Sequence, residues 1–186
     1  MYISIVRHGT TTWNSLKKIQ GQADPPLNEE GIEQAKRLGE QLKNTSESYD
    51  IIFSSYRKRA KMTAELICGD QNKTILYNKL LNSRNVGIFS GMTLDEIKEK
   101  FPEDYEKWIR GDPDFCPPGG ESTEKLAKRC EDFITFIKET YPKDSKLLVV
   151  THRENLALLA YYITGERIID ALRRVKNCTL YMYELK

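Results

Sequence analysis

The segment YISIVRHG, residues 2–9, begins with a run of apolar and β-branched residues and then changes to an arginine, a histidine and a glycine. A second segment of the same kind, KLLVVTH at residues 146–152, holds the other of the two histidines in the chain. Both apolar runs predict strands, and each histidine follows its strand almost at once. Ligands of open α/β sheets bind beyond the carboxyl ends of the strands. If the two strands are parallel neighbours, His8 and His152 meet at that edge of the sheet.

Strand-like and helix-like segments alternate along the rest of the chain, which is typical of an α/β protein. We expect strands at residues 2–7, 50–54, 74–78, 145–151 and 177–185. We expect helices over Glu29 to Asn44, Arg57 to Cys68, a short stretch after Thr93 that stops near Pro102, a stretch through Leu126 to Ile137, and a last helix from beyond His152 to near Gly165. The predicted fold is a three-layer α/β/α arrangement with a mostly parallel central sheet and an antiparallel edge strand.

Residues 101–122 differ in composition from the rest of the chain and are rich in aromatic residues, proline and glycine. They predict an excursion over one end of the sheet and no further βα unit. We therefore expect residues 83–122 to form a small cap over the crevice. With no linker or repeat in the sequence, residues 1–186 are predicted to form a single domain.

The composition limits the classes of partner. The 29 basic and 27 acidic side chains nearly balance, so no overall field favours nucleic acid or an anionic membrane. Without a signal-like or membrane-spanning segment, a cytoplasmic location is expected. The four cysteines lack metal-ligand spacing and predict buried or half-buried free thiols, and neither a metal nor another cofactor is expected.

Several motifs surround the histidines. RHGTTTWN at residues 7–14 precedes IQGQADPPLNEEGIEQA at 19–35, FSS at 53–55 precedes Arg59-Ala60, and PPGGES at 117–122 precedes the VTH of residues 150–152. In this order they resemble the histidine phosphatase superfamily, also called the phosphoglycerate mutase-like family, over nearly the whole chain. The phosphatase branch, with α-ribazole phosphate phosphatases and broad-specificity phosphatases, is the more similar part of that family.

The resemblance implies a role for each matching residue. His8 would be the nucleophile that becomes phosphorylated, Arg7, Arg59 and His152 would line the phosphate pocket, and Asn14 and Gly21 would add contacts. The chemistry agrees with these roles, because a neutral imidazole is nucleophilic at pH 7 and a guanidinium binds phosphate oxygens bidentately. Arg59 also falls in the first turn of a predicted helix, where anions bind.

The sequence departs from the family where the proton donor is expected. Ser83 stands in place of the usual active-site glutamate, Ser90 precedes Gly91 where the family tends to have a glutamate, and Arg153-Glu154 follows the second histidine in place of small residues. A serine is a poor proton donor, whereas a carboxylic acid in a pocket can have its pKa raised toward neutrality. We expect Ser83 and Arg153 to lie beside the substrate.

Three explanations are open: Glu154 serves as the acid, the leaving group departs without a proton, or catalysis has decayed. The predicted function is a metal-independent phosphomonoester hydrolase that acts through a phosphohistidine on His8, with an atypical or missing general acid. Phosphoglycerate mutase-type phosphoryl transfer and a catalytically impaired phospholigand-binding protein are the alternatives. The expected partner is a small phosphorylated metabolite, and the edge strand at residues 177–185 allows a homodimer.

Overall fold

The computed structural model describes residues 1–45, 48–70, 73–112 and 114–186. Its centre is a five-stranded sheet in the order β3-β2-β4-β1-β5, in which β5 is antiparallel to β1 and the other pairs are parallel. The strands are β1 (Tyr2–Arg7), β2 (Ile51–Ser54), β3 (Ile75–Tyr77), β4 (Lys146–Thr151) and β5 (Leu180–Glu184). The predicted sheet with its antiparallel edge strand is confirmed.

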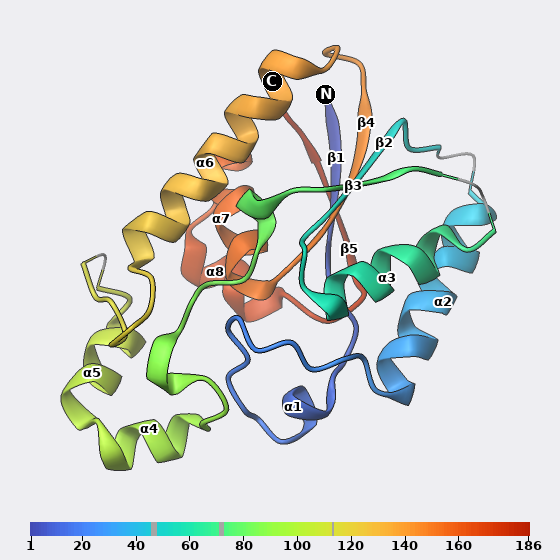
Figure 1. Cartoon of the computed structure of the whole chain (residues 1–186). Helices are drawn as coiled ribbons and strands as arrows, with labels where there is room; N and C mark the ends of the chain where they lie inside the picture. Colours follow the sequence, from blue (N-terminus) through green and yellow to red (C-terminus); the bar gives the residue numbers. More distant parts are fainter. Residues whose placement is uncertain (46–47, 71–72, 113) are drawn as a thin grey trace.

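Helices cover both faces of this sheet, as Figure 1 shows. One face carries α2 (Glu29–Lys43) and α3 (Lys58–Cys68), and the other carries α6 (Thr123–Thr140), α7 (Arg153–Thr164) and α8 (Ile168–Arg174). The strands alternate between the two cores: Ile5 and Val149 pack toward α6 and α7, whereas Val6 and Val150 pack toward α2 and α3. This alternation follows from the two-residue period of a strand.

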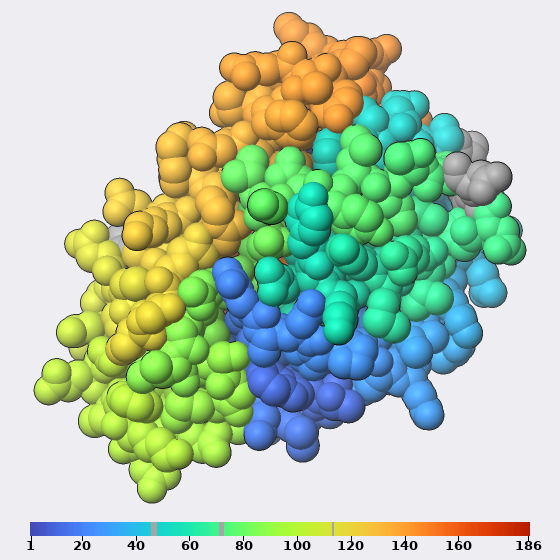
Figure 2. Space-filling model, viewed as in Figure 1, coloured from blue at the N-terminus to red at the C-terminus, as the bar shows by residue number. Residues whose placement is uncertain are grey.

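The cap holds α4 (Leu94–Lys100) and α5 (Pro102–Arg110), together with two 3-10 turns at Lys79–Leu81 and Gly87–Phe89 that lead into it. The short helix α1 (Thr12–Ser15) lies in the loop after β1. Figures 1 and 2 show the yellow-green cap beside the blue N-terminal segment, and Figure 1 shows that both lie beyond the carboxyl ends of the strands. Residue 113, inside the predicted cap, lies outside the described residues.

Two details of the sequence prediction were wrong, and one helix within residues 101–122 was not predicted. The helix that ends at Thr164 is not the last one, because Ile168, Ala171, Leu172 and Val175 recur with a helical period and form the apolar face of α8. The stretch at 101–122 contains the helix α5, which Pro102 begins at a position where proline is well tolerated. Cys116 is an exposed free thiol, although all four cysteines are free as predicted.

The pairing of β1 with β4 brings the two histidines together. Arg7 is in register with Thr151, and the backbone N–H of His8 donates to the Thr151 carbonyl at 3.0 Å. Both strands therefore end at the same level of the sheet, and the imidazole centroids of His8 and His152 lie 5.3 Å apart. The expected meeting of the two histidines at the carboxyl edge is a direct result of this register.

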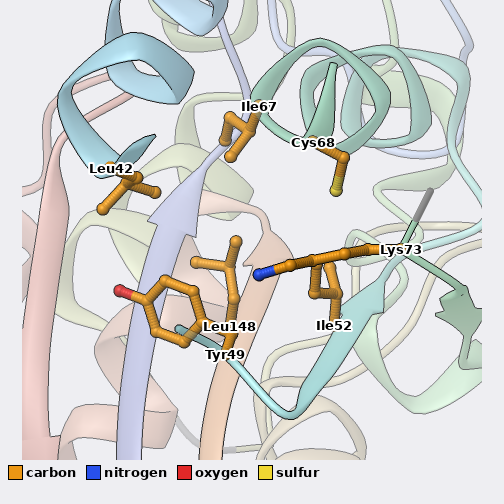
Figure 3. A pocket seen from close by; sticks show the side chains of 7 residues that line it. All are labelled: Leu42, Tyr49, Ile52, Ile67, Cys68, Lys73 and Leu148. Atoms are coloured by element: carbon orange, nitrogen blue, oxygen red, sulfur yellow. The ribbon is translucent and has the colours of Figure 1, made fainter. Parts of the chain in front are cut away.

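A cavity of about 20 Å³ lies between α2, α3 and the sheet, where Leu42, Ile67 and Leu148 form part of its wall and the Lys73 side chain spans it (Figure 3). A volume of this size holds about one water molecule. It is a packing gap on the face of the sheet and provides no room for a metabolite.

Two glycines allow α2 to approach the RHG loop. A Cβ atom on Gly31, in the first turn of α2, would lie 2.1 Å from the carbonyl oxygen of Thr10, and one on Gly9 would lie 2.6 Å from the carbonyl oxygen of Gly31. These are contacts between backbones, which no side-chain rotation can relieve. The two glycines therefore fix the position of the loop that carries His8.

We predict that Gly31→Ala lowers the free energy of unfolding by about 2 kcal/mol, because overpacking against a backbone outweighs the gain in helix propensity. Glu33→Ala, at an exposed position in the same helix, is the matched control and should change stability by less than about 0.5 kcal/mol. Urea unfolding monitored by circular dichroism provides both values. Equal stability of Gly31→Ala and the native protein would contradict the close approach.

Candidate active site

A pocket of about 540 Å³ opens beyond the carboxyl ends of β1 and β4 and is bordered by the cap and α8. All nine residues that the sequence placed in the site line this pocket. They are His8, Arg7, Arg59, His152, Glu154, Asn14, Gly21, Ser83 and Arg153. The structure thus brings together residues from the first half of the chain and from its last quarter.

His8 lies at the base of the pocket and is 4% exposed. Its Nδ1 lies 2.7 Å from the Gly9 carbonyl oxygen. Because a carbonyl can only accept, Nδ1 carries the proton and Nε2 keeps its lone pair. Burial and the neighbouring guanidinium groups of Arg59 and Arg7 hold the pKa of His8 well below its usual value. The ring is therefore neutral, and the lone pair lies on Nε2.

Arg59 reaches this atom from the first turn of α3. Its Nε donates to Nε2 of His8 at 3.2 Å, and its terminal nitrogens donate to the carbonyls of Ala23 and Gly21 at 2.7 and 2.9 Å. The positive φ of Gly21, +50°, lets the chain turn so that its carbonyl faces the guanidinium. These bonds hold the buried Arg59 cation beside the proposed nucleophile. Burial lowers the pKa of Arg59 to about 10, so it stays charged at pH 7.

His152 is fixed by a serine that the sequence analysis did not assign to the site. The Ser55 hydroxyl donates to Oδ1 of Asn82 at 3.0 Å, and its oxygen lies 2.8 Å from Nε2 of His152. Since the hydroxyl proton is used, Nε2 of His152 is the donor and Nδ1 carries the lone pair. Burial, followed by the charge of Arg59, lowers the pKa of His152 well below its usual value.

Three buried polar atoms in the pocket lining have no partner within the described residues. They are Nε of Arg7, Oε1 of Gln20 and Nδ1 of His152. Burying an unpaired polar group is costly, and native proteins keep few of them. Nε of Arg7 is a charged donor that can bind an anion, whereas Oε1 of Gln20 and Nδ1 of the neutral His152 accept hydrogen bonds. Their convergence on one pocket indicates a site for a ligand with both negative charge and a hydroxyl donor, as in a phosphate group with one protonated oxygen. Arg7 keeps its charge at pH 7, because burial lowers its pKa only to about 10.

The residues that depart from the family pattern also lie around this pocket. Ser83 lines it, whereas Ser90 donates to the Gln20 carbonyl at 3.1 Å and so joins the cap to the loop below it. Arg153 lines the pocket and is held by two hydrogen bonds from its guanidinium to the Leu172 carbonyl in α8. Asn14 lines it too, and its Oδ1 caps α1 by accepting from the backbone N–H of Thr11.

Glu154 lies in the first turn of α7 and is ion-paired with Arg84, whose Nη1 lies 3.7 Å from Oε1 of Glu154. Burial raises the pKa of Glu154, and the charges of Arg84 and Arg153 oppose that rise. The side chain is nevertheless 35% exposed, so water in the pocket reaches the carboxyl group. The result is a carboxyl group with a raised pKa in the same pocket as Nε2 of His8.

Arg84 is a second residue that the sequence analysis missed. Its guanidinium is almost fully buried and donates to the carbonyls of Glu121 and Phe115 at 2.9 and 3.0 Å, which attaches Glu154 to the cap. The sequence signal that could have identified Arg84 was its position next to Ser83. Lys17 and Lys18 were missed as well, and Lys17 has a left-handed backbone, φ +55°, that a lysine adopts only where its surroundings impose it.

Comparisons with known proteins identify the family of this chain. The family model for the histidine phosphatase superfamily (branch 1) matches residues 3–186. A phosphoglycerate mutase from Schizosaccharomyces pombe is 32% identical over 175 residues, which cover 89% of this chain and 82% of that protein. Phosphoserine phosphatase 1 from Hydrogenobacter thermophilus is 32% identical over 148 residues, which cover 80% and 69%.

Solved structures show the same fold. The structure of a putative α-ribazole-5'-P phosphatase from Escherichia coli superimposes with a TM-score of 0.88 and 27% identity, covering 98% of this chain and 89% of that one. A mycobacterial glucosyl-3-phosphoglycerate phosphatase superimposes with a TM-score of 0.84 and 25% identity, covering 97% and 91%.

The chain therefore belongs to the histidine phosphatase superfamily, branch 1. Membership in this family of phosphatases and mutases confirms the expectation of a phosphatase-family enzyme. The described residues contain no group of three or more histidine, cysteine, aspartate or glutamate side chains placed to hold a metal ion. Among the same residues, no helix is long and apolar enough to cross a membrane.

We predict that Arg84→Gln raises the pKa of Glu154, because the cation that most strongly favours the carboxylate is removed. Arg153→Gln removes the weaker of the two cations and should produce a smaller rise. Arg84→Lys, which keeps the charge, should also produce a smaller rise than Arg84→Gln. Titration of the Glu154 carboxyl carbon by NMR measures all three values. An unchanged or lower pKa in folded Arg84→Gln would show that Arg84 does not act on this group.

Proposed function

We propose that the protein is a metal-independent phosphomonoester hydrolase that acts through a phosphohistidine on Nε2 of His8, with Glu154 as the general acid. The observation that carries the proposal is the tautomer of His8. Its Nδ1 is bonded to the Gly9 carbonyl, so the lone pair lies on Nε2 at the base of the pocket, where it accepts a hydrogen bond from Nε of Arg59. This lone pair attacks phosphorus once the Arg59 donor turns to a phosphoryl oxygen. The substrate class is a small phosphorylated metabolite, and residues 1–186 act as one domain.

In the first step, the lone pair of Nε2 attacks the phosphorus atom, and the bond from phosphorus to the alcohol oxygen breaks. Negative charge spreads over the phosphoryl oxygens, so positioning and cations supply most of the catalysis. Arg7 and Arg59 provide these cations. The neutral Nδ1 of His152 accepts a hydrogen bond from a protonated phosphate oxygen. The alcohol oxygen takes the proton of Glu154 and leaves as the neutral alcohol.

In the second step, water attacks the phosphorus atom of the phosphohistidine, and the bond between phosphorus and Nε2 breaks. The Glu154 carboxylate formed in the first step accepts the proton of this water. Inorganic phosphate leaves, and His8 returns to its neutral form with Nδ1 still bonded to the Gly9 carbonyl. Each step is a displacement that is easier than direct attack of water on the ester.

Two observations support Glu154 in this role. Its pKa is raised by burial, which keeps a larger fraction protonated near neutral pH than for an ordinary glutamate. The Glu154 side chain is 35% exposed, so a water molecule can reach the carboxylate that would activate that water. That access favours hydrolysis over a mutase reaction, in which the phosphohistidine must be protected from water.

The test compares two substrates whose leaving groups differ in their need for a proton. On an alkyl phosphate, Glu154→Gln should lower kcat/KM by about 10²- to 10³-fold, because an alkoxide leaves poorly. On para-nitrophenyl phosphate the loss should stay below about tenfold, since the phenolate leaves unprotonated. Ser83→Ala is the matched control at the family's usual acid position and should lose less than about tenfold on both substrates.

Equal losses on the two substrates, or a larger loss in Ser83→Ala, would contradict the assignment of Glu154. A native protein that hydrolyses neither ester would contradict the hydrolase itself and favour a phospholigand-binding protein.

A further inference from the structure

The mouth of the pocket is formed in part by exposed aliphatic side chains. Leu94 from α4, Ile109 from α5 and Ile169 from α8 line it and are 43%, 53% and 49% exposed. A single exposed leucine or isoleucine on a protein surface is ordinary. Here three come from three separate helices and converge on one opening, so the mouth presents apolar surface to whatever enters.

This convergence is not a general property of the surface. The large exposed leucine and isoleucine side chains of the described residues are Leu16, Leu76, Ile88, Leu94, Ile109 and Ile169. Half of them line this one pocket. Exposed apolar side chains that gather at a concave opening are typical of a ligand-binding surface.

The apolar surface continues inward. Leu172 of α8 and Trp108 of α5 line the same pocket. Trp108 is stacked on Phe89 with 5.1 Å between ring centroids, and Phe89 is fully buried in the cap core. This contact holds the indole in place while part of it faces the pocket. Trp108 therefore packs against the cap core and also presents a surface that a ligand can touch.

Two further properties of the pocket limit what it binds. Its volume of about 540 Å³ lies within the range that holds an organic ligand of considerable size, far beyond a phosphate group alone. Lys17, Lys18 and Arg173 also line it, outside the centre formed by the histidines, Arg7 and Arg59. Cations at a concave site attract a phosphate dianion from solution.

We propose that the outer part of this pocket binds an apolar leaving group, so that the preferred substrates are phosphomonoesters of bulky aliphatic or aromatic alcohols. The inference rests on the phosphate-binding centre of the proposed function and adds the class of alcohol. The phosphate lies against His8 and the arginines, and the carbon skeleton extends between Trp108, Ile109 and Ile169 toward the mouth.

The test measures binding separately from catalysis by using alkylphosphonates, whose phosphorus–carbon bond is not hydrolysed. Calorimetry of the native protein with ethylphosphonate and hexylphosphonate gives two dissociation constants. Because the mouth of the pocket covers only one side of the alkyl chain, each added methylene should tighten binding by roughly twofold. Hexylphosphonate should therefore bind about 16-fold more tightly than ethylphosphonate.

The double variant Ile109→Ser, Ile169→Ser removes two exposed apolar side chains and should reduce that ratio to about fourfold or less. Ile88→Ser is the matched control, because Ile88 is 48% exposed and does not line the pocket. It should keep the native ratio. A ratio near one in the native protein, or the same ratio in the double variant and the control, would overturn the proposal.

A third probe, 6-phosphonohexanoate, replaces the apolar end with a carboxylate. Weaker binding than hexylphosphonate supports an apolar site, whereas tighter binding would overturn the proposal in favour of a second anion held by the lysines. Hydrolysis of hexyl phosphate is measured in parallel. Length-dependent binding of the phosphonates without hydrolysis would leave the outer site established and contradict the phosphatase.

Discussion

The parallel pairing of β1 with β4 is the constraint on which the candidate site depends. Arg7 pairs with Thr151 in the register, and the N–H of His8 donates to the Thr151 carbonyl, so both histidines leave the sheet at the same level. A slip of one residue would turn every side chain of a strand to the opposite face and bury the core residues wrongly. Val6 and Val150 in one core, and Ile5 and Val149 in the other, hold the register that positions the imidazoles.

Electrostatics then determines what these imidazoles can do. Burial and two arginines lower the pKa of both histidines, so each ring is neutral and its hydrogen-bond partners select one tautomer. The Gly9 carbonyl selects the form of His8 that exposes Nε2, and Ser55 selects the form of His152 that exposes Nδ1. The cationic pocket is unfavourable without an anion, because like charges repel and polar atoms stay unpaired. A bound phosphate group neutralises the cations, and a protonated oxygen of that group donates to Nδ1 of His152, so binding relieves both costs.

The sequence predicted the sheet, the layers of helices and the nine pocket residues because strand periodicity and motif order are local signals. It did not predict α8, whose apolar positions at 168, 171, 172 and 175 follow a glycine that ends the preceding helix. Arg84 was not predicted because its role depends on an ion pair with Glu154, which is remote in sequence and approaches Arg84 only in the folded chain. The roles of Ser55 and Lys17 depend in the same way on a hydrogen-bond partner and a backbone angle that only the folded chain defines.

The central claim is that phosphate passes through Nε2 of His8, and trapping the intermediate tests it most directly. The protein is mixed with 32P-labelled phosphomonoester, quenched in alkali within the first turnover, and digested for mass spectrometry. Because N-phosphohistidine survives alkali, the account predicts one labelled peptide that contains residues 7–9, with the phosphoryl group on the Nε2 isomer and no label in His8→Ala. Label on His152, label on a serine, or product release without any labelled peptide would contradict it.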